Sequence, residues 1–226
     1  MDFKCFTKVL TNRLVPIAQM VIGKNQKGSV KGRNILEGVI VLREVIHELH
    51  STNQRGFILK IDFEKAYDRV RWHFLEQVTI EKGFPSLWVD WIMSTVRGGQ
   101  VCINVNGERS PYFKTFRGLR QGDPLSPLLF NLVADVLGVL LNKAVDRGHI
   151  RGVLTDLLPG GISHIKYADD TVIMIDGSDQ SIRNLKLIFY CFEWLTGLKI
   201  NFHKVKCLYL VYRKKRGREW PTCLIV

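Results

Sequence analysis

Apolar residues recur along this chain with two spacings, and each spacing predicts a different kind of element. Residues spaced as on one helix face predict five helices, over about residues 34–49, 72–82, 86–97, 126–141 and 179–196. The mostly apolar run Phe57–Ile61 predicts a strand that is buried on both faces. Helices that precede and follow short antiparallel strands, without regular strand–helix alternation, indicate an α+β fold.

Local signals predict where several of these elements begin, end or break. Asn34 is a plausible cap for the helix beginning at residue 35, and Ser86 for the helix over residues 86–97. A further helix over residues 8–22 contains Pro16, which lacks a backbone donor, so we expect a break there.

Two hairpins are predicted. Asn106-Gly107 supplies the two positive-φ residues of a tight turn between strands that carry alternating apolar residues. The second hairpin places Tyr167-Ala168-Asp169-Asp170 at or beside a turn, between the short strand-like runs 164–166 and 171–175. The two adjacent acids at this turn are the most informative feature of the chain.

The composition of the chain limits which partners and which cellular location we expect for it. A formal charge of +12 favours a polyanionic partner such as nucleic acid, although an anionic membrane surface or simple solubility would also explain it. Five scattered cysteines without metal-ligand spacing indicate reduced thiols in a nuclear or cytoplasmic protein. We expect no apolar run of membrane-spanning length and no secretory signal at the N-terminus. We therefore predict a protein that is not secreted and has no membrane partner.

The acids at the second turn suggest a metal site. Asp169 and Asp170 repel each other unless a cation compensates them, and carboxylate oxygens suit Mg²⁺. The alternative is an exposed acidic turn. A third acid, Asp62, ends the buried strand 57–61, where it either caps the next element or faces a cleft as a ligand. One strand-end carboxylate and a carboxylate hairpin can hold two ions for phosphoryl transfer.

The ordered set of motifs resembles the reverse transcriptases of non-LTR (LINE-type) retrotransposons. Tyr167–Asp170, Leu59–Asp68 and Gly118–Asn131 match the central motifs of that family, in the same order. Weaker similarities flank them, in segments 8–14, 26–35 and 197–204. The resemblance covers about residues 3–208 and suggests a truncated copy of such an element.

The resemblance implies the palm of a right-hand polymerase, an antiparallel sheet packed on helices, with partial fingers. We expect fingers over residues 1–55, the palm with interleaved fingers elements over 56–212, and a basic tail over 213–226. The tail is expected to be disordered, either as a nucleic-acid-binding or nuclear-targeting segment or as a frayed end. No helical bundle comes after the palm, so we expect no thumb.

The resemblance also implies a metal site. Asp62 and Asp169 would hold two Mg²⁺ ions, with Mn²⁺ as an alternative, and Asp170 would contribute more weakly. The backbone carbonyl of Phe63 would be a further ligand. Asp68 is expected to cap the next helix or to pair with an arginine rather than to bind metal.

Five more residues are implied to bind the nucleotide. The Tyr67 ring would lie under the nucleotide sugar and exclude a 2′-hydroxyl. The alternative is that Tyr67 serves only in ordinary helix packing. Gln121 and Gly122 would contact the incoming nucleotide and the template. Arg33 would grip the triphosphate, and Lys204, if it is more than a surface lysine, would donate a proton to pyrophosphate.

The function implied is that of an RNA-directed DNA polymerase, with an RNA template, a DNA primer and deoxynucleoside triphosphates as partners. The alternative is a catalytically inactive remnant that retains RNA or DNA binding. An RNA-templated RNA polymerase is a third hypothesis, against which Tyr67 argues. The sequence leaves the activity of this chain and its oligomeric state open.

Overall fold

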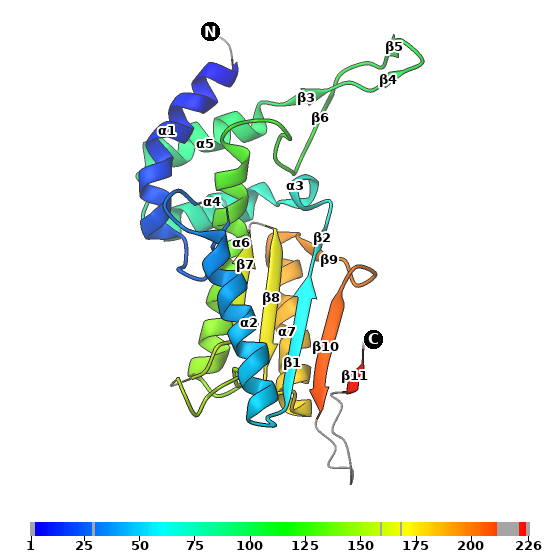
Figure 1. Cartoon of the computed structure of the whole chain (residues 1–226). Helices are drawn as coiled ribbons and strands as arrows, with labels where there is room; N and C mark the ends of the chain where they lie inside the picture. Colours follow the sequence, from blue (N-terminus) through cyan, green and yellow to red (C-terminus); the bar gives the residue numbers. More distant parts are fainter. Residues whose placement is uncertain (1–2, 29, 159, 168, 212–221, 225–226) are drawn as a thin grey trace.

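The computed structural model describes residues 3–28, 30–158, 160–167, 169–211 and 222–224 (Figure 1). In chain order, the elements are α1 (Phe3–Val21), α2 (Ile35–Ser51), β1 (Gly56–Ile61), β2 (Phe63–Glu64), α3 (Ala66–Arg69), α4 (Trp72–Glu81), α5 (Ser86–Arg97), β3 (Gln100–Val101), β4 (Asn104–Val105), β5 (Glu108–Arg109), β6 (Phe113–Lys114), α6 (Ser126–Asp146), β7 (His164–Tyr167), β8 (Asp170–Ile175), α7 (Asp179–Thr196), β9 (Lys199–Ile200), β10 (Lys206–Val211) and β11 (Thr222–Leu224). Helices and antiparallel strands do not alternate regularly, which confirms the predicted α+β class.

Within the described residues, the main sheet has the strand order β11-β10-β1-β8-β7. All of its strand pairings are antiparallel, and β1 lies between β10 and β8. The α2 helix crosses one face of this sheet, and α7 lies behind the other face (Figure 1). The sheet is therefore a layer between helices, as predicted.

Successive side chains of β1 enter two different cores. Ile58 packs with Val172 beneath Val45 of α2. Leu59 and Ile61 belong instead to the larger core that includes α6 and α7. Because side chains of a strand alternate between faces, this arrangement confirms the prediction of a strand buried on both sides.

The α6 helix is the main core helix. Its Ser126–Asp146 span is long and apolar enough to cross a membrane by length and composition, and 67% of its most apolar window is buried within this protein. The expectation that no segment reaches that length and hydropathy is therefore wrong. Burial inside the fold explains the hydropathy of this helix without a membrane.

The predicted break at Pro16 is also wrong, because α1 continues through it to Val21. Leu10, Leu14 and Ala18 are buried, whereas Pro16 lies on the exposed side of the helix. The proline removes one backbone donor where water can reach the orphaned carbonyl, and burial of the opposite face holds the helix together.

Helix capping agrees with the local signals in one of the two predicted cases. The Asn34 side chain accepts a hydrogen bond from the Leu36 N–H at 2.9 Å, which confirms it as the cap of α2. Ser86 is instead the first residue of α5, and Pro85 occupies the cap position without a side-chain bond. The prediction is wrong there by one residue.

The Asn106-Gly107 hairpin is confirmed. These residues have φ of 52° and 90° and join β4 to β5, as a tight turn with two left-handed residues requires. The hairpin projects from the body of the molecule (Figure 1). Its residues are exposed, so it packs little against the core.

The C-terminal region is only partly described. The basic run Arg213–Arg218 lies outside the described residues. Residues Thr222–Leu224, which we expected to be disordered, form β11 and pair with β10, so the prediction is wrong for these three. Cys5, Cys102 and Cys191 have free thiols, in line with the expectation of reduced cysteines.

Candidate active site

The register of the main sheet brings the predicted acids to one edge. Ile61 of β1 lies opposite Thr171 of β8, so Asp62 leaves β1 beside Asp170, where β8 begins. Asp170 in turn pairs with Tyr167 across the β7–β8 hairpin. After the role predicted for these acids from the sequence, we call residues 167, 169 and 170 the catalytic turn and this end of β1 and β8 the catalytic edge. Segments more than a hundred residues apart thus meet at this edge.

Two lysines neutralise two of these acids. The Lys60 Nζ lies 2.8 Å from Asp170 Oδ2, and the Lys204 Nζ lies 3.3 Å from Asp62 Oδ2. The lysine side chains are 47% and 69% exposed, respectively. Exposed ion pairs of this kind contribute about 0–1 kcal/mol, so these lysines can exchange partners at little cost.

A short second sheet carries Lys204 to the edge. β2 pairs with β9 through Phe63 and Ile200, directly after Asp62. The Asn201 N–H then donates to the Asp62 carbonyl at 2.8 Å, and the Lys204 N–H donates to the Asn201 carbonyl at 2.9 Å. This turn explains how a residue far along the chain reaches the first acid.

Over the described residues, no three His, Cys, Asp or Glu side chains lie close enough together to form a metal site. Asp62, Asp169 and Asp170 nevertheless share one edge and offer the oxygen donors that hard divalent cations prefer. The residues present therefore fit a divalent cation by donor type, once the carboxylates turn away from their lysines. Coordination by the Phe63 carbonyl stays a prediction.

Tyr67 lies beside the acids, in the single-turn helix α3. Its ring stacks on Phe130 of α6, with ring centroids 5.2 Å apart. Burial raises the pKa of the Tyr67 hydroxyl, and the negative charge of Asp169 raises it further. The tyrosine is therefore both packed against the core and within electrostatic reach of the catalytic turn.

Tyr67, Gln121 and Gly122 line one pocket of about 570 Å³, together with residues 123, 124, 126 and 127. The structure thus brings together three of the five residues predicted to bind the nucleotide. Gly122 has a φ of 80°, a conformation that favours glycine. The contact of this pocket with a nucleotide stays a prediction.

The loop that carries Gln121 is fixed to the α3 turn by backbone bonds. The Gly118 N–H donates to the Val70 carbonyl at 2.8 Å, and the Leu119 N–H donates to the Tyr67 carbonyl at 2.7 Å. A side chain at Gly118 would lie 2.9 Å from the Asp68 carbonyl oxygen, so this close approach requires glycine. These contacts therefore fix the position of Tyr67 relative to the loop that carries Gln121.

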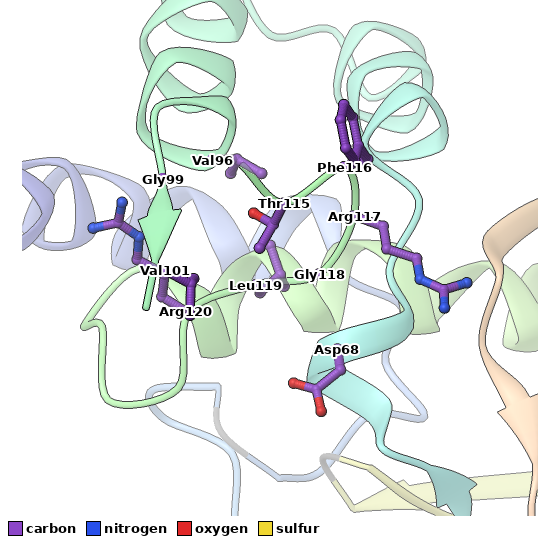
Figure 2. Close-up of a pocket in the computed structure, with 10 residues that line it drawn as sticks. All are labelled: Asp68, Val96, Gly99, Val101, Thr115, Phe116, Arg117, Gly118, Leu119 and Arg120. Atoms are coloured by element: carbon purple, nitrogen blue, oxygen red, sulfur yellow. The ribbon is translucent and has the colours of Figure 1, made fainter. Parts of the chain in front are cut away.

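Asp68 has a partner that we did not expect. Its Oδ1 accepts a hydrogen bond of 3.4 Å from the Gln121 Nε2, rather than capping a helix or pairing with an arginine. Asp68 also lines a second pocket, of about 400 Å³, together with Gly118, Leu119 and Arg120 of the loop. Figure 2 shows Arg117 and Arg120 extending from this loop in opposite directions.

Arg33 is not directed at this edge. Its two terminal nitrogens donate to four backbone carbonyls, those of Gln19 (3.0 Å), Ile22 (2.8 Å), Gly23 (2.6 Å) and Gln26 (2.8 Å). The guanidinium thereby ties the end of α1 to the loop after it. Binding of a triphosphate by Arg33 stays a prediction, and it would require these bonds to open.

Sequence reasoning missed Lys60 as a partner of Asp170. Lys60 left one signal, because it is the polar residue within an otherwise apolar strand.

Comparison with known proteins matches most of this chain to one protein family. The family model described as "Reverse transcriptase (RNA-dependent DNA polymerase)" matches residues 1–221. The chain is 32% identical over 179 residues to the Retrovirus-related Pol polyprotein from type-2 retrotransposable element R2DM of Drosophila melanogaster, which covers 79% of this chain and 16% of that protein. It is 27% identical over 173 residues to the Transposon TX1 uncharacterized 149 kDa protein of Xenopus laevis, covering 76% of this chain and 13% of that protein. The chain therefore spans under a fifth of either relative.

Solved structures show the same fold at low identity. Telomerase from Candida tropicalis in complex with a fragment of telomeric RNA superposes with a TM-score of 0.63 at 12% identity, over 98% of this chain and 36% of that one. The apo telomerase from the same organism, truncated from its C-terminal domain, gives a TM-score of 0.61 over 99% of this chain and 44% of that one. At this identity the likeness shows the fold alone.

Proposed function

Because the chain belongs to the reverse transcriptase (RNA-dependent DNA polymerase) family, we propose that it is the polymerase part of a non-LTR retrotransposon protein. It would extend a DNA primer with deoxynucleotides along an RNA template. The central sheet would be the palm and residues 1–55 part of the fingers. The formal charge of +12 supports binding to both nucleic acid strands.

One observation carries the proposal. Asp62 directly follows Ile61, whose partner Thr171 directly follows the Asp169-Asp170 pair, and Tyr67 is within electrostatic reach of Asp169; this supports a shared site. Tyr67 also lines the pocket with Gln121. A carboxylate edge next to a pocket of nucleotide size is the arrangement that nucleotidyl transfer needs.

Asp62, Asp169 and Asp170 would hold two divalent cations, which we propose to be Mg²⁺. When bound, the cations would activate the primer 3′-oxygen and neutralise charge at the α-phosphate. The chain itself would orient the nucleotide: the Tyr67 ring would exclude a 2′-hydroxyl, and Gln121 would donate or accept hydrogen bonds with the nucleotide or template.

Lys204 would act on the leaving group. Its ammonium already lies at the catalytic edge, 3.3 Å from Asp62, and its side chain is mostly exposed. From there it could neutralise the pyrophosphate or donate a proton to it. Arg33 could contribute only after leaving its four carbonyl partners.

Primer extension on poly(rA)/oligo(dT) with Mg²⁺ tests the proposal. We expect the wild-type chain to extend the primer and the Asp169→Asn variant to lose this activity. Asp90→Asn is a matched control, because Asp90 is an exposed residue of α5, outside the catalytic edge. Equal extension by wild type and Asp169→Asn would overturn the proposal.

The second candidate function is a remnant that binds nucleic acid without catalysis. It is favoured by the engagement of both Asp62 and Asp170 with lysines and of Arg33 with backbone carbonyls. RNA binding with a steep salt dependence, combined with no extension by any variant, would support it.

A further inference from the structure

The strand that leads into the catalytic turn is held from outside the sheet by the loop of residues 23–28. The Lys166 N–H donates to the Asn25 carbonyl at 2.9 Å, and the Lys27 N–H donates to the Lys166 carbonyl at 2.7 Å. Gln26 lies opposite Lys166 in a parallel bridge. Because β7 is the outer strand of the sheet, the loop supplies the backbone partners of Lys166 on that side.

Side chains on both sides of this bridge are anchored to α6. Gln26 is 1% exposed, its Nε2 donates to Asn131 Oδ1 at 3.2 Å, and its Oε1 accepts from the Gly28 N–H at 3.1 Å. Lys166 is also 1% exposed and donates to the Ala134 carbonyl at 2.5 Å. The loop and β7 are therefore fixed to the same core helix.

A second contact holds the next residue, Tyr167. A Cβ atom added at Gly38 of α2 would lie 2.4 Å from the Tyr167 Oη and 2.8 Å from its Cζ. Real Cβ contacts are never this short, so the tyrosine ring can lie here only against a glycine. Glycine is unfavourable inside a helix, and this packing is a physical reason for it to stand at this position.

We propose that Gln26 and Gly38 are positioning residues for the polymerase reaction. They hold Lys166 and Tyr167, and thereby set the position of Asp169 and Asp170 relative to Asp62. This inference rests on the proposed function. It assigns to the loop 23–28 and to α2 a role in positioning the active-site acids, in addition to any contact with nucleotide.

A displacement of the turn should affect the rate more than substrate affinity. The positioned groups act on the reacting atoms, and a shift of about 1 Å in such groups can lower a rate by about 10²-fold. Residues of the Tyr67 pocket lie on α3, on the loop of residues 121–124 and at the start of α6, and none of them belongs to the loop 23–28. The KM for the nucleotide should therefore change little.

The Gly38→Ala variant tests this separation. We expect a fall in kcat of about 10- to 100-fold in primer extension, with the KM for dTTP within about twofold of wild type. Alanine is the better helix former, so α2 itself should not be weakened. Ile40→Ala is the matched control, because Ile40 lies in the same helix and is 58% exposed; it should retain wild-type kcat.

A double-mutant cycle tests whether removing the clash with Tyr167 reduces the loss of kcat. In a Tyr167→Phe background the nearest clashing atom, Oη, is gone, so Gly38→Ala should lower kcat by a smaller factor than it does in wild type. Gln26→Met, which keeps the side-chain volume but removes its hydrogen bonds, is the second variant. It should lower kcat in the same direction and keeps the test decisive if Gly38→Ala fails to fold.

Hydrogen exchange provides a readout that does not need activity. In Gly38→Ala and Gln26→Met the amides of Lys27 and Lys166 should exchange faster, while amides of β1 should stay protected. Wild-type exchange and wild-type kcat in both variants would overturn the inference, as would equal effects of Gly38→Ala with and without Tyr167→Phe. If wild type and Asp169→Asn extend the primer equally, the proposed function fails, and exchange alone decides whether these contacts hold β7.

Discussion

Lysine and aspartate side chains meet in two regions of this molecule, under opposite conditions. At the catalytic edge, Lys204 and Lys60 pair with Asp62 and Asp170, and the four side chains are 25% to 69% exposed. Beneath the loop 23–28, the Lys82 Nζ lies 2.8 Å from Asp135 Oδ2, and these side chains are only 16% and 6% exposed. We call this second region, which also includes Lys166 and His164, the buried polar cluster.

The difference shows how burial decides what an ion pair can do. In the cluster, Asp135 also accepts the Gly23 N–H at 2.9 Å, so removing its side chain would leave this N–H without its partner and the Lys82 ammonium with the Val21 carbonyl but no counter-ion. At the edge, water can solvate either partner, so the lysines can exchange for a cation or a phosphate. The first arrangement maintains structure, and the second leaves charges available for chemistry.

The largest expected effect is on activity at the edge. Asp62→Asn should lower primer extension by about 10³-fold or more, because it removes charge at the reaction centre. Its free energy of unfolding should change by about 1 kcal/mol or less, since the Lys204 side chain is 69% exposed although Asp62 is only 25% exposed. Primer extension and urea unfolding measure the two quantities. An Asp62→Asn protein that keeps its activity, or one that does not fold, would contradict the contrast between the catalytic edge and the buried polar cluster.

The next largest effect is on stability in the buried cluster. Asp135→Ala should lower the free energy of unfolding by about 3–5 kcal/mol, because the Lys82 ammonium would remain buried without its counter-ion. Urea unfolding measures the loss, with Asp90→Ala as the exposed control. A loss below about 1 kcal/mol would show that the buried Lys82–Asp135 pair stabilises the fold no more than the ion pairs at the catalytic edge do.

The pH dependence of stability gives a third test. The pKa of His164 is lowered to about 4, chiefly by burial and also by the nearby Lys166 charge, while Asp135 opposes the shift. The unfolded chain would bind the proton near the ordinary pKa of 6.5. The contribution of His164 is therefore complete above pH 6.5 and is lost as the pH falls toward 4, by about 3 kcal/mol.

The His164→Gln variant should lose this part of the pH dependence in urea unfolding measured from pH 7 to pH 4. His47→Gln, at an exposed position of α2, should keep it. Parallel curves for wild type and His164→Gln would show that the ring is not held neutral in the folded protein.

The smallest expected effect is a change in stability at the catalytic edge. Lys60→Ala should change the free energy of unfolding by about 1 kcal/mol or less, because the pair with Asp170 is nearly half exposed. Thermal or urea unfolding measures it. A loss comparable to that of Asp135→Ala would remove the distinction between the two regions.

Local patterns predicted much of the fold. The Asn106-Gly107 turn, the Asn34 cap and the β7–β8 hairpin depend on residues within a few positions of one another, and each is present. Pro16 shows the limit of such signals, because burial of Leu10 and Leu14 outweighs the local cost of the proline.

The candidate site was predictable as a set of residues but not as a set of contacts. Motif order brought Asp62, Asp169 and Asp170 to attention, and the strand register then placed them at one edge. The lysine partners of Asp62 and Asp170 depend on which surfaces meet across the fold.

The sequence by itself determined the family, the element types and the acids, because these depend on short-range spacing and on motifs along the chain. The tertiary structure alone decided that Arg33 binds backbone carbonyls, that Gly38 lies under Tyr167, and which aspartates are buried. These facts depend on contacts between distant segments, whose free energies come from the packing and desolvation of both partners and from neither one alone.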